Sequence, residues 1–315
     1  MIRKAIIISI SGPKLTLKEK KLFKKPLPWG VILFKRNIKS FSQLEKLTKS
    51  IRKITNDKKY PILIDEEGGT VSRLKRIMDT KIFSQRYFGK IYENNKIIGT
   101  KIYINYLKEI SLILNKLGIN LNTTPVLDKL NKRTHNFLIS RIYSDKTSTI
   151  KNLGQICINI QKKNKIFSVI KHIPGHGLAN SDSHKKLPII NKNLNYLLRN
   201  DFSCFKNING LFAMTAHVLY KKIDDKNCVT HSNKLIKEII RKKLNFKGIL
   251  ISDDISMKSL KHNLVENATK ALTAGCNLAL YCNGKINDNY KLIEKIPIID
   301  GFTKKKTAVF YKLMG

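Results

Sequence analysis

Eight apolar runs recur along the chain, and they limit the folds that the sequence can adopt. Most are continuous stretches of Ile, Leu, Val and Phe rather than alternating patterns, which is typical of strands buried on both faces. Such strands occur in parallel sheets that helices cover on both sides. The runs span Lys4–Ile10, Trp29–Phe34, Pro61–Asp65, Ile119–Val126, Phe167–His172, Leu211–Val218, Gly248–Asp253 and Asn277–Cys282.

Segments with helical spacing of apolar residues separate these runs. In one of them Leu235, Ile236 and Ile239 share a face, and lysines occupy the other. Eight buried strands alternating with helices in 315 residues predict a (β/α)8 TIM-like barrel of the α/β class. A doubly wound open sheet is the alternative. No linker or repeat interrupts the pattern, so we expect residues 1–315 to form a single domain. Examples of the predicted helices are Phe41–Thr55, Tyr103–Leu117, Ser148–Lys163, Lys234–Leu244 and Leu264–Ala274, with a closing helix over 303–315.

Polar and ionisable residues gather where the apolar runs end. Asp65-Glu66-Glu67 follows the third run, and Asp128 follows the fourth. The seventh run ends in Asp253-Asp254. In a barrel, the carboxyl ends of the strands form the face that carries active sites. This convergence therefore predicts one site at that end of the barrel. Adjacent strand residues point to opposite faces, so we expect only one of the two last aspartates to face the site.

Residues 171–184 carry the densest set of reactive side chains. The segment reads Lys-His-Ile-Pro-Gly-His-Gly, then four residues, then Asp-Ser-His. Pro and Gly exclude a regular helix, and the preceding apolar run predicts a strand that ends here. Asp182 and His184 are close enough for the carboxylate to hold the imidazole in one tautomer. With Asp253 at another strand end, this set suits nucleophilic and general acid–base catalysis. Arg73, Arg141 and Lys171 are candidate hydrogen-bond donors to a hydroxyl-rich ligand.

A zinc site is the competing interpretation of the histidines. Histidine and aspartate are common zinc ligands. His172 and His176 have the spacing of helical ligands, but Pro174 and Gly175 between them break the helix that this geometry needs. We therefore expect no metal and no other cofactor. The residues that this alternative would use are His172, His176, His184 and His217 with Asp65 or Asp253.

The net charge of +39 raises the question of an anionic partner. Lysine is spread over nearly every segment and occurs with abundant Ile and Asn, residues that share A/T-rich codons. This distribution favours a genome bias over a dedicated nucleic-acid site, and no nucleic-acid motif accompanies it. We expect only weak, salt-sensitive binding to polyanions. A polyanion-binding protein remains the distant alternative.

The sequence also favours a cytoplasmic protein without a membrane partner. No window approaches the roughly 18 apolar residues that a membrane span needs. The apolar stretch Ala5–Ile10 is short and has no small-residue cleavage site after it. The five cysteines are scattered and odd in number, which fits a reducing compartment.

Several segments taken together resemble glycoside hydrolase family 3. The Lys171–His184 pattern, Lys-His-x-Pro-Gly-His-Gly-x4-Asp-Ser-His, is highly specific. Within the family, the chain is similar to the single-domain bacterial β-N-acetylhexosaminidases of peptidoglycan recycling. The supporting segments, in the same order along the chain, are Gly30–Asn37, Ile64–Gly69, Gly118–Asn120, Pro125–Asp128, Met214–Val218, Ser252–Met257 and Ala274–Cys276.

The resemblance implies a retaining enzyme that removes terminal β-linked N-acetylglucosamine from muropeptides ending in 1,6-anhydro-N-acetylmuramic acid. Asp253 matches the nucleophile that forms a covalent glycosyl-enzyme. His184 matches the general acid/base, and Asp182 matches its orienting partner. A monomer that needs no cofactor is expected. The sugar-binding positions map to Asp65, Arg73, Arg141, Lys171 and His172.

Some positions depart from the family pattern. Thr70 stands where the family usually has Arg. The segment Ile139–Asp145 keeps Arg141 but has an Ile where Phe is usual, and it lacks the Pro that usually follows Asp145. No catalytic position is lost, so we expect an active enzyme. A β-glucosidase or a glycoside phosphorylase on the same scaffold remains the alternative.

Overall fold

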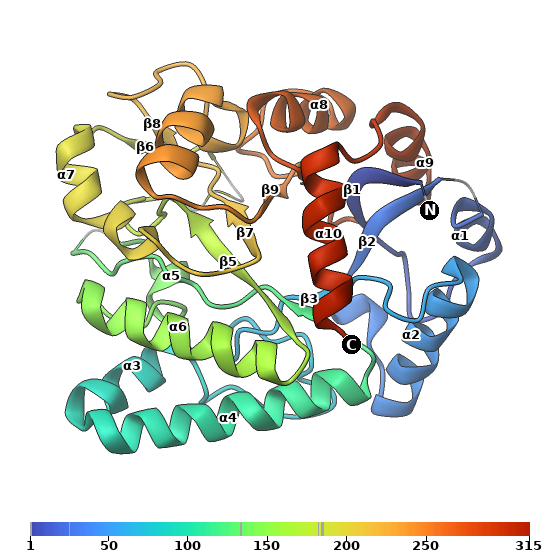
Figure 1. Ribbon diagram of the computed structural model, residues 1–315, viewed down its shortest axis with the longest axis horizontal. Coiled ribbons are helices and arrows are strands. Elements are labelled where there is room, and N and C mark those ends of the chain that lie inside the picture. The colour runs from blue at the N-terminus through green and yellow to red at the C-terminus, as the bar shows by residue number, and fades with distance from the viewer. Residues whose placement is uncertain (1, 25, 133, 182, 184–185) are drawn as a thin grey trace.

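A closed barrel of eight parallel strands forms the centre of the protein in the computed structural model (Figure 1). The structure describes residues 2–24, 26–132, 134–181, 183 and 186–315. The first and last strands pair, with Ile7 opposite Leu280, so the predicted barrel is confirmed and the open sheet is wrong. The strands are β1 (Arg3–Ser9), β2 (Leu27–Leu33), β3 (Ile62–Ile64), β4 (Leu121–Asn122), β5 (Phe167–Ile173), β7 (Phe212–Thr215), β9 (Ile249–Asp254) and β10 (Leu278–Leu280).

Helices surround this barrel, as the apolar spacing predicts. The predictions for α2 and α8 match in both bounds, whereas α4 begins at Lys96, before the predicted Tyr103. The helices are α1 (Leu17–Leu22), α2 (Phe41–Thr55), α3 (Gln85–Asn94), α4 (Lys96–Lys116), α5 (Asn136–Ile139), α6 (Thr147–Lys163), α7 (Leu194–Arg199), α8 (Leu264–Ala274), α9 (Ile286–Lys295) and α10 (Gly301–Leu313). Three 3₁₀-helices are η1 (Lys35–Asn37), η2 (Asp201–Phe205) and η3 (Val229–His231), and η4 (Leu235–Lys243) is a π-helix.

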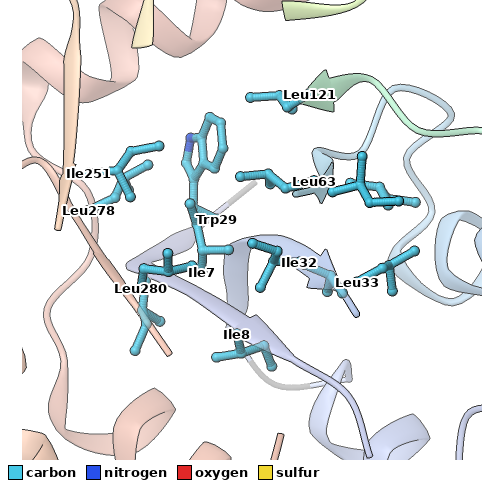
Figure 2. Packing of buried hydrophobic residues seen from close by; sticks show 14 of the residues in the cluster. Ile7, Ile8, Trp29, Ile32, Leu33, Leu63, Leu121, Ile251, Leu278 and Leu280 are labelled. Atoms are coloured by element: carbon cyan, nitrogen blue, oxygen red, sulfur yellow. The ribbon is translucent and has the colours of Figure 1, made fainter. Parts of the chain in front are cut away.

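The barrel interior is filled by large apolar side chains from different strands. Trp29 of β2 lies among Leu63, Leu121, Ile251 and Leu278, which come from β3, β4, β9 and β10 (Figure 2). All five side chains are fully buried. Interdigitation of this kind makes the barrel a packed core rather than a channel. The strand ends are thus held rigidly, which is what a site built on them requires.

The helix α10 closes the end of the barrel opposite the site. Phe310 packs against Trp29, Phe167 and Phe212, with ring centroids 6.2, 5.0 and 5.8 Å away. The indole N–H of Trp29 donates to Oγ1 of Thr307 at 2.9 Å. In Figure 1, α10 crosses in front of the barrel strands. Because these contacts come from β2, β5 and β7, one helix joins strands from across the barrel.

A second sheet of two short strands lies outside the barrel. β6 (Ile189–Ile190) pairs in parallel with β8 (Leu219–Tyr220). These strands belong to the connections that follow β5 and β7, so the pairing joins two loops on the site face. Two-residue strands are too short for a periodicity to reveal them.

Among the described residues, no helix is both long and apolar enough to cross a membrane.

Candidate active site

A pocket of about 620 Å³ opens where the strands end. Its size is within the range of small-molecule sites. Asp182 and His184 lie outside the described residues, but their neighbour Ser183 lines the pocket. The structure brings together the other six predicted site residues in the pocket wall, namely Asp65, Arg73, Arg141, Lys171, His172 and Asp253.

Lys171 at the end of β5 connects two carboxylates that follow β3. Its Nζ lies 2.5 Å from Oδ1 of Asp65 and 2.5 Å from Oε1 of Glu67. The ammonium group also donates to Oγ1 of Thr123 at 3.0 Å. Because an ammonium group has three donors, these contacts can satisfy it fully. Its side chain is only 3% exposed, so this charge is held among partners rather than in water.

Two arginines complete this ion-pair network. Arg141 donates from Nε and Nη2 to the two oxygens of Glu67 at 2.8 and 2.9 Å, a bidentate pair. Arg73 pairs with Asp65. Bidentate geometry fixes the plane of the guanidinium group, so Arg141 cannot reorient freely. Alternating charges thus join the side chains contributed by β5, by the loop after β3 and by the segment after α5.

The network keeps its carboxylates ionised. Burial alone would raise the pKa of Asp65, but the charges of Lys171 and Arg73 hold it well below its usual range. Burial also opposes ionisation of Glu67, and Arg141 and then Lys171 lower its pKa. A fixed pattern of full charges therefore faces the pocket.

Asp128 organises the histidines of the segment after β5. Its Oδ2 lies 2.7 Å from Nδ1 of His172, and its Oδ1 accepts from the backbone N–H of His176 at 2.7 Å. Against the effect of burial, the two histidines lower the pKa of Asp128. An ionised carboxylate only accepts hydrogen bonds, so Nδ1 of His172 carries the proton in this contact. The contact therefore fixes the orientation of the His172 ring from below the pocket.

Asp253 and Asp254 both line the pocket at the end of β9, but they differ in what surrounds them. The carboxylate of Asp254 accepts from the hydroxyl and backbone N–H of Ser256 and from the backbone N–H of Cys282. Burial first, and then the charge of Asp253, raises the pKa of Asp254. Asp254 therefore shapes the turn after β9, but it also lines the pocket, so the expectation that only one of the two aspartates faces the site is wrong. The same aspartate accepts, through its backbone carbonyl, from Nε2 of His217 at 3.0 Å if that nitrogen is protonated.

Apolar groups form the remaining walls. Phe34, Phe137, Met214 and Met257 line the pocket together with the charged network. The guanidinium group of Arg73 lies 5.3 Å from the ring centre of Phe34. Nε of Arg73 has no hydrogen-bond partner among the described residues. A ligand with hydroxyl groups on its edges and apolar C–H faces would match both kinds of wall.

The structure also assigns places to residues whose roles the sequence did not reveal. Glu67 and Asp128 hold predicted site residues, and their position directly after apolar runs was the available signal. His217 does not line the pocket; its Nδ1 contacts Thr230 instead. Over the ranges that the structure describes, no group of three or more His, Cys, Asp or Glu side chains is placed to hold a metal ion.

Comparisons with known proteins agree with this architecture. Residues 4–300 match the family described as glycosyl hydrolase family 3 N terminal domain. A β-hexosaminidase of Haemophilus influenzae is 33% identical over 310 residues, which cover 93% of this chain and 85% of the relative. A β-hexosaminidase of Methylobacillus flagellatus is 32% identical over 285 residues, covering 88% and 80%. The crystal structure of NagZ from Neisseria gonorrhoeae in complex with N-trifluoroacetyl-D-glucosamine has a TM-score of 0.88 at 27% identity, covering 100% of this chain and 90% of the other.

Proposed function

The chain belongs to glycosyl hydrolase family 3, and from this we propose that it is a retaining exo-β-N-acetylglucosaminidase. Its substrate would be the terminal β-linked N-acetylglucosamine of muropeptides that end in 1,6-anhydro-N-acetylmuramic acid. The observation that carries the proposal is the pocket itself, in which Asp253 shares a wall with five predicted sugar-binding side chains. The related β-hexosaminidases and the sugar analogue bound to NagZ support the choice of an N-acetylated sugar.

In the first step, Asp253 attacks the anomeric carbon of the bound sugar. A bond forms between its carboxylate oxygen and that carbon, while the bond to the leaving oxygen breaks with its electron pair. Protonated His184 donates a proton to the leaving oxygen and becomes neutral, and Asp182 holds its ring in place. In the second step, neutral His184 takes a proton from water as the water attacks, and the sugar leaves Asp253 with retained configuration.

The ion-pair network would bind the sugar hydroxyls. Asp65 offers acceptor oxygens, Arg73 and Arg141 offer donors, and Lys171 would share or exchange one of its three occupied donors with a sugar hydroxyl. Their mutual pairing fixes these groups before the sugar enters, so little reorganisation is needed when it binds. His172, held by Asp128, adds a ring nitrogen in a defined orientation. Charged hydrogen-bonding groups of this kind would discriminate strongly against an analogue that lacks the matching hydroxyl.

We also propose the setting in which the enzyme works. Residues 1–315 would act as one catalytic domain, since the barrel begins at Arg3 and α10 returns to its base. Five free cysteines support a cytoplasmic protein. We propose that it acts as a monomer and without a cofactor.

The test is hydrolysis of an aryl β-N-acetylglucosaminide beside the matching β-glucoside, with wild type and Asp253→Ala. We expect release from the N-acetyl substrate alone and loss of turnover in the variant. Turnover that the substitution leaves intact would contradict the nucleophile assignment, and a preference for the glucoside would contradict the substrate class. Equal rates with and without phosphate would indicate hydrolysis rather than phosphorolysis.

A further inference from the structure

Ser183 lies between the two residues proposed as the acid/base pair, and it makes a specific contact. Its side chain lines the pocket and is only 3% exposed. The hydroxyl oxygen lies 3.2 Å from Nε2 of His176. Ser183 is joined to both of these residues by peptide bonds, so a change at Ser183 can act on both.

His176 provides a rigid anchor for this contact. Its backbone N–H donates to Oδ1 of Asp128, and its ring packs edge-on against Phe137 and His172 at centroid distances of 5.8 and 5.6 Å. The side chain is 1% exposed. A ring held from these directions cannot follow Ser183 if the segment moves. The contact therefore ties Ser183 to the base of the pocket.

The ring is suited to this contact because it is neutral. Burial first, and then the neighbouring His172, lowers the pKa of His176 to about 4. An uncharged imidazole has one donor nitrogen and one acceptor nitrogen, and a serine hydroxyl can complement either. Nδ1 has no hydrogen-bond partner within the described part of the chain. The contact with Ser183 is therefore the side-chain hydrogen bond that the structure gives His176.

We propose that the His176–Ser183 hydrogen bond holds Ser183, and through its peptide bonds the proposed acid/base pair, in position for proton transfer. This inference rests on the proposed function. A general acid must lie within hydrogen-bond reach of the leaving oxygen, and a misplacement of about 1 Å can reduce the rate about 100-fold. His176 and Ser183 are thus positioning residues, which act through Asp182 and His184 rather than on the sugar itself.

The test uses two aryl β-N-acetylglucosaminides that differ in leaving-group acidity. 2,4-Dinitrophenolate departs without a proton, whereas phenolate needs the general acid. We expect Ser183→Ala to lower kcat/KM about tenfold for the phenyl substrate, as for the loss of one hydrogen bond, and to change it little for the dinitrophenyl substrate. A general structural defect would reduce both alike.

A matched control and a double variant sharpen the result. Ser181→Ala removes a buried hydroxyl from the same segment and should leave the leaving-group dependence unchanged. If His176 acts through Ser183, the double variant His176→Ala/Ser183→Ala should be no slower on the phenyl substrate than His176→Ala alone. Equal losses on both substrates, no loss on either, or additive effects would overturn the inference while the proposed function stands. If the wild-type protein cleaves neither substrate, both this inference and the proposed function are wrong.

Discussion

At the scale of single residues, Lys171 and Glu67 turn separate side chains into one binding unit. Lys171 joins Asp65 to Glu67, and Glu67 in turn holds Arg141. Arg73 completes the set through Asp65. Four of these five residues are proposed sugar ligands. The fifth, Glu67, contacts two of these ligands but is not proposed to bind the sugar itself. Removal of Glu67 should therefore show how far the ligands depend on one another.

We expect Glu67→Gln to lower the free energy of unfolding by about 3–5 kcal/mol, because it leaves Arg141 buried without its carboxylate. It should also raise KM for the aryl substrate, since Arg141 and Lys171 lose their fixed positions. Urea unfolding at pH 7 and steady-state kinetics measure the two effects. The matched control is Glu45→Gln on α2, where the pair of a partly buried Glu45 with the exposed Lys49 should contribute at most about 1 kcal/mol. Similar effects for both variants would contradict the role given to Glu67.

The residues of the pocket illustrate what the sequence can and cannot predict. Each predicted sugar-binding residue follows or ends an apolar run, or carries a family motif, and so could be placed near the strand ends. Their pairing could not be predicted, because Glu67 and Arg141 are 74 positions apart in the chain. Which cation meets which carboxylate depends on how the loops after β3 and α5 fold over the barrel. The roles of Asp182 and His184 remain predictions, since both lie outside the described residues.

At the scale of elements, the strands were predictable because burial on both faces leaves an unbroken apolar run. The same holds for α2 and α8, whose apolar faces repeat with helical spacing. The elements that escaped prediction are governed by tertiary contacts. β6 and β8 have only two residues each. The helix predicted over Lys234–Leu244 is present as η4, but its hydrogen bonding is of the wider, π type. Local pattern does not distinguish these forms.

The helix η2 places a buried carboxyl beneath the segment after β5. A Cβ atom on Gly177 would lie 1.9 Å from the carbonyl oxygen of Lys129 and 2.9 Å from Oδ1 of Asp201, so glycine is needed for this close approach. Oδ2 of Asp201 has no hydrogen-bond partner among the described residues. Burial first, and then the charge of Asp128, raises the pKa of Asp201 to about 8.

Because the pKa of Asp201 is raised, the wild-type protein should lose folding stability as pH rises. The substitution Asp201→Asn should abolish this loss. Between the unfolded pKa of about 4 and the folded value of about 8, the folded state binds the extra proton. The free energy of unfolding therefore falls as pH rises through this window, by up to about 1.4 kcal/mol per unit. Asparagine has no proton to lose, so the stability of the variant relative to wild type should increase from pH 5 to pH 8. Urea unfolding across this range measures the difference, and a constant offset would show that Asp201 is ionised throughout.

At the scale of the whole molecule, the charge is distributed unevenly between interior and surface. The chain has 61 basic and 22 acidic residues. Several of the acidic side chains are buried in or below the pocket, among them Glu66, Glu67, Asp128 and Asp201. The surface therefore carries even fewer carboxylates than the 22 acidic residues of the whole chain suggest. In the pocket, by contrast, Arg141 and Lys171 are paired at short range, where salt screens little.

The contrast between exposed lysines and paired pocket charges predicts that added salt should weaken polyanion binding but leave hydrolysis nearly unchanged. Exposed lysines should bind a labelled DNA duplex or heparin weakly at 50 mM salt through release of counterions, and a footprint of 6–10 phosphates would lose about 10³–10⁵ in affinity by 200 mM. Hydrolysis of the aryl N-acetylglucosaminide should change little over the same range, because it depends on paired, buried charges. Fluorescence anisotropy with two unrelated duplexes tests the first part and kinetics the second. Binding that survives 200 mM salt and prefers one duplex would mean that the positive charge forms a dedicated nucleic-acid site, whereas equal, salt-erased binding is what a composition rich in lysine produces without one.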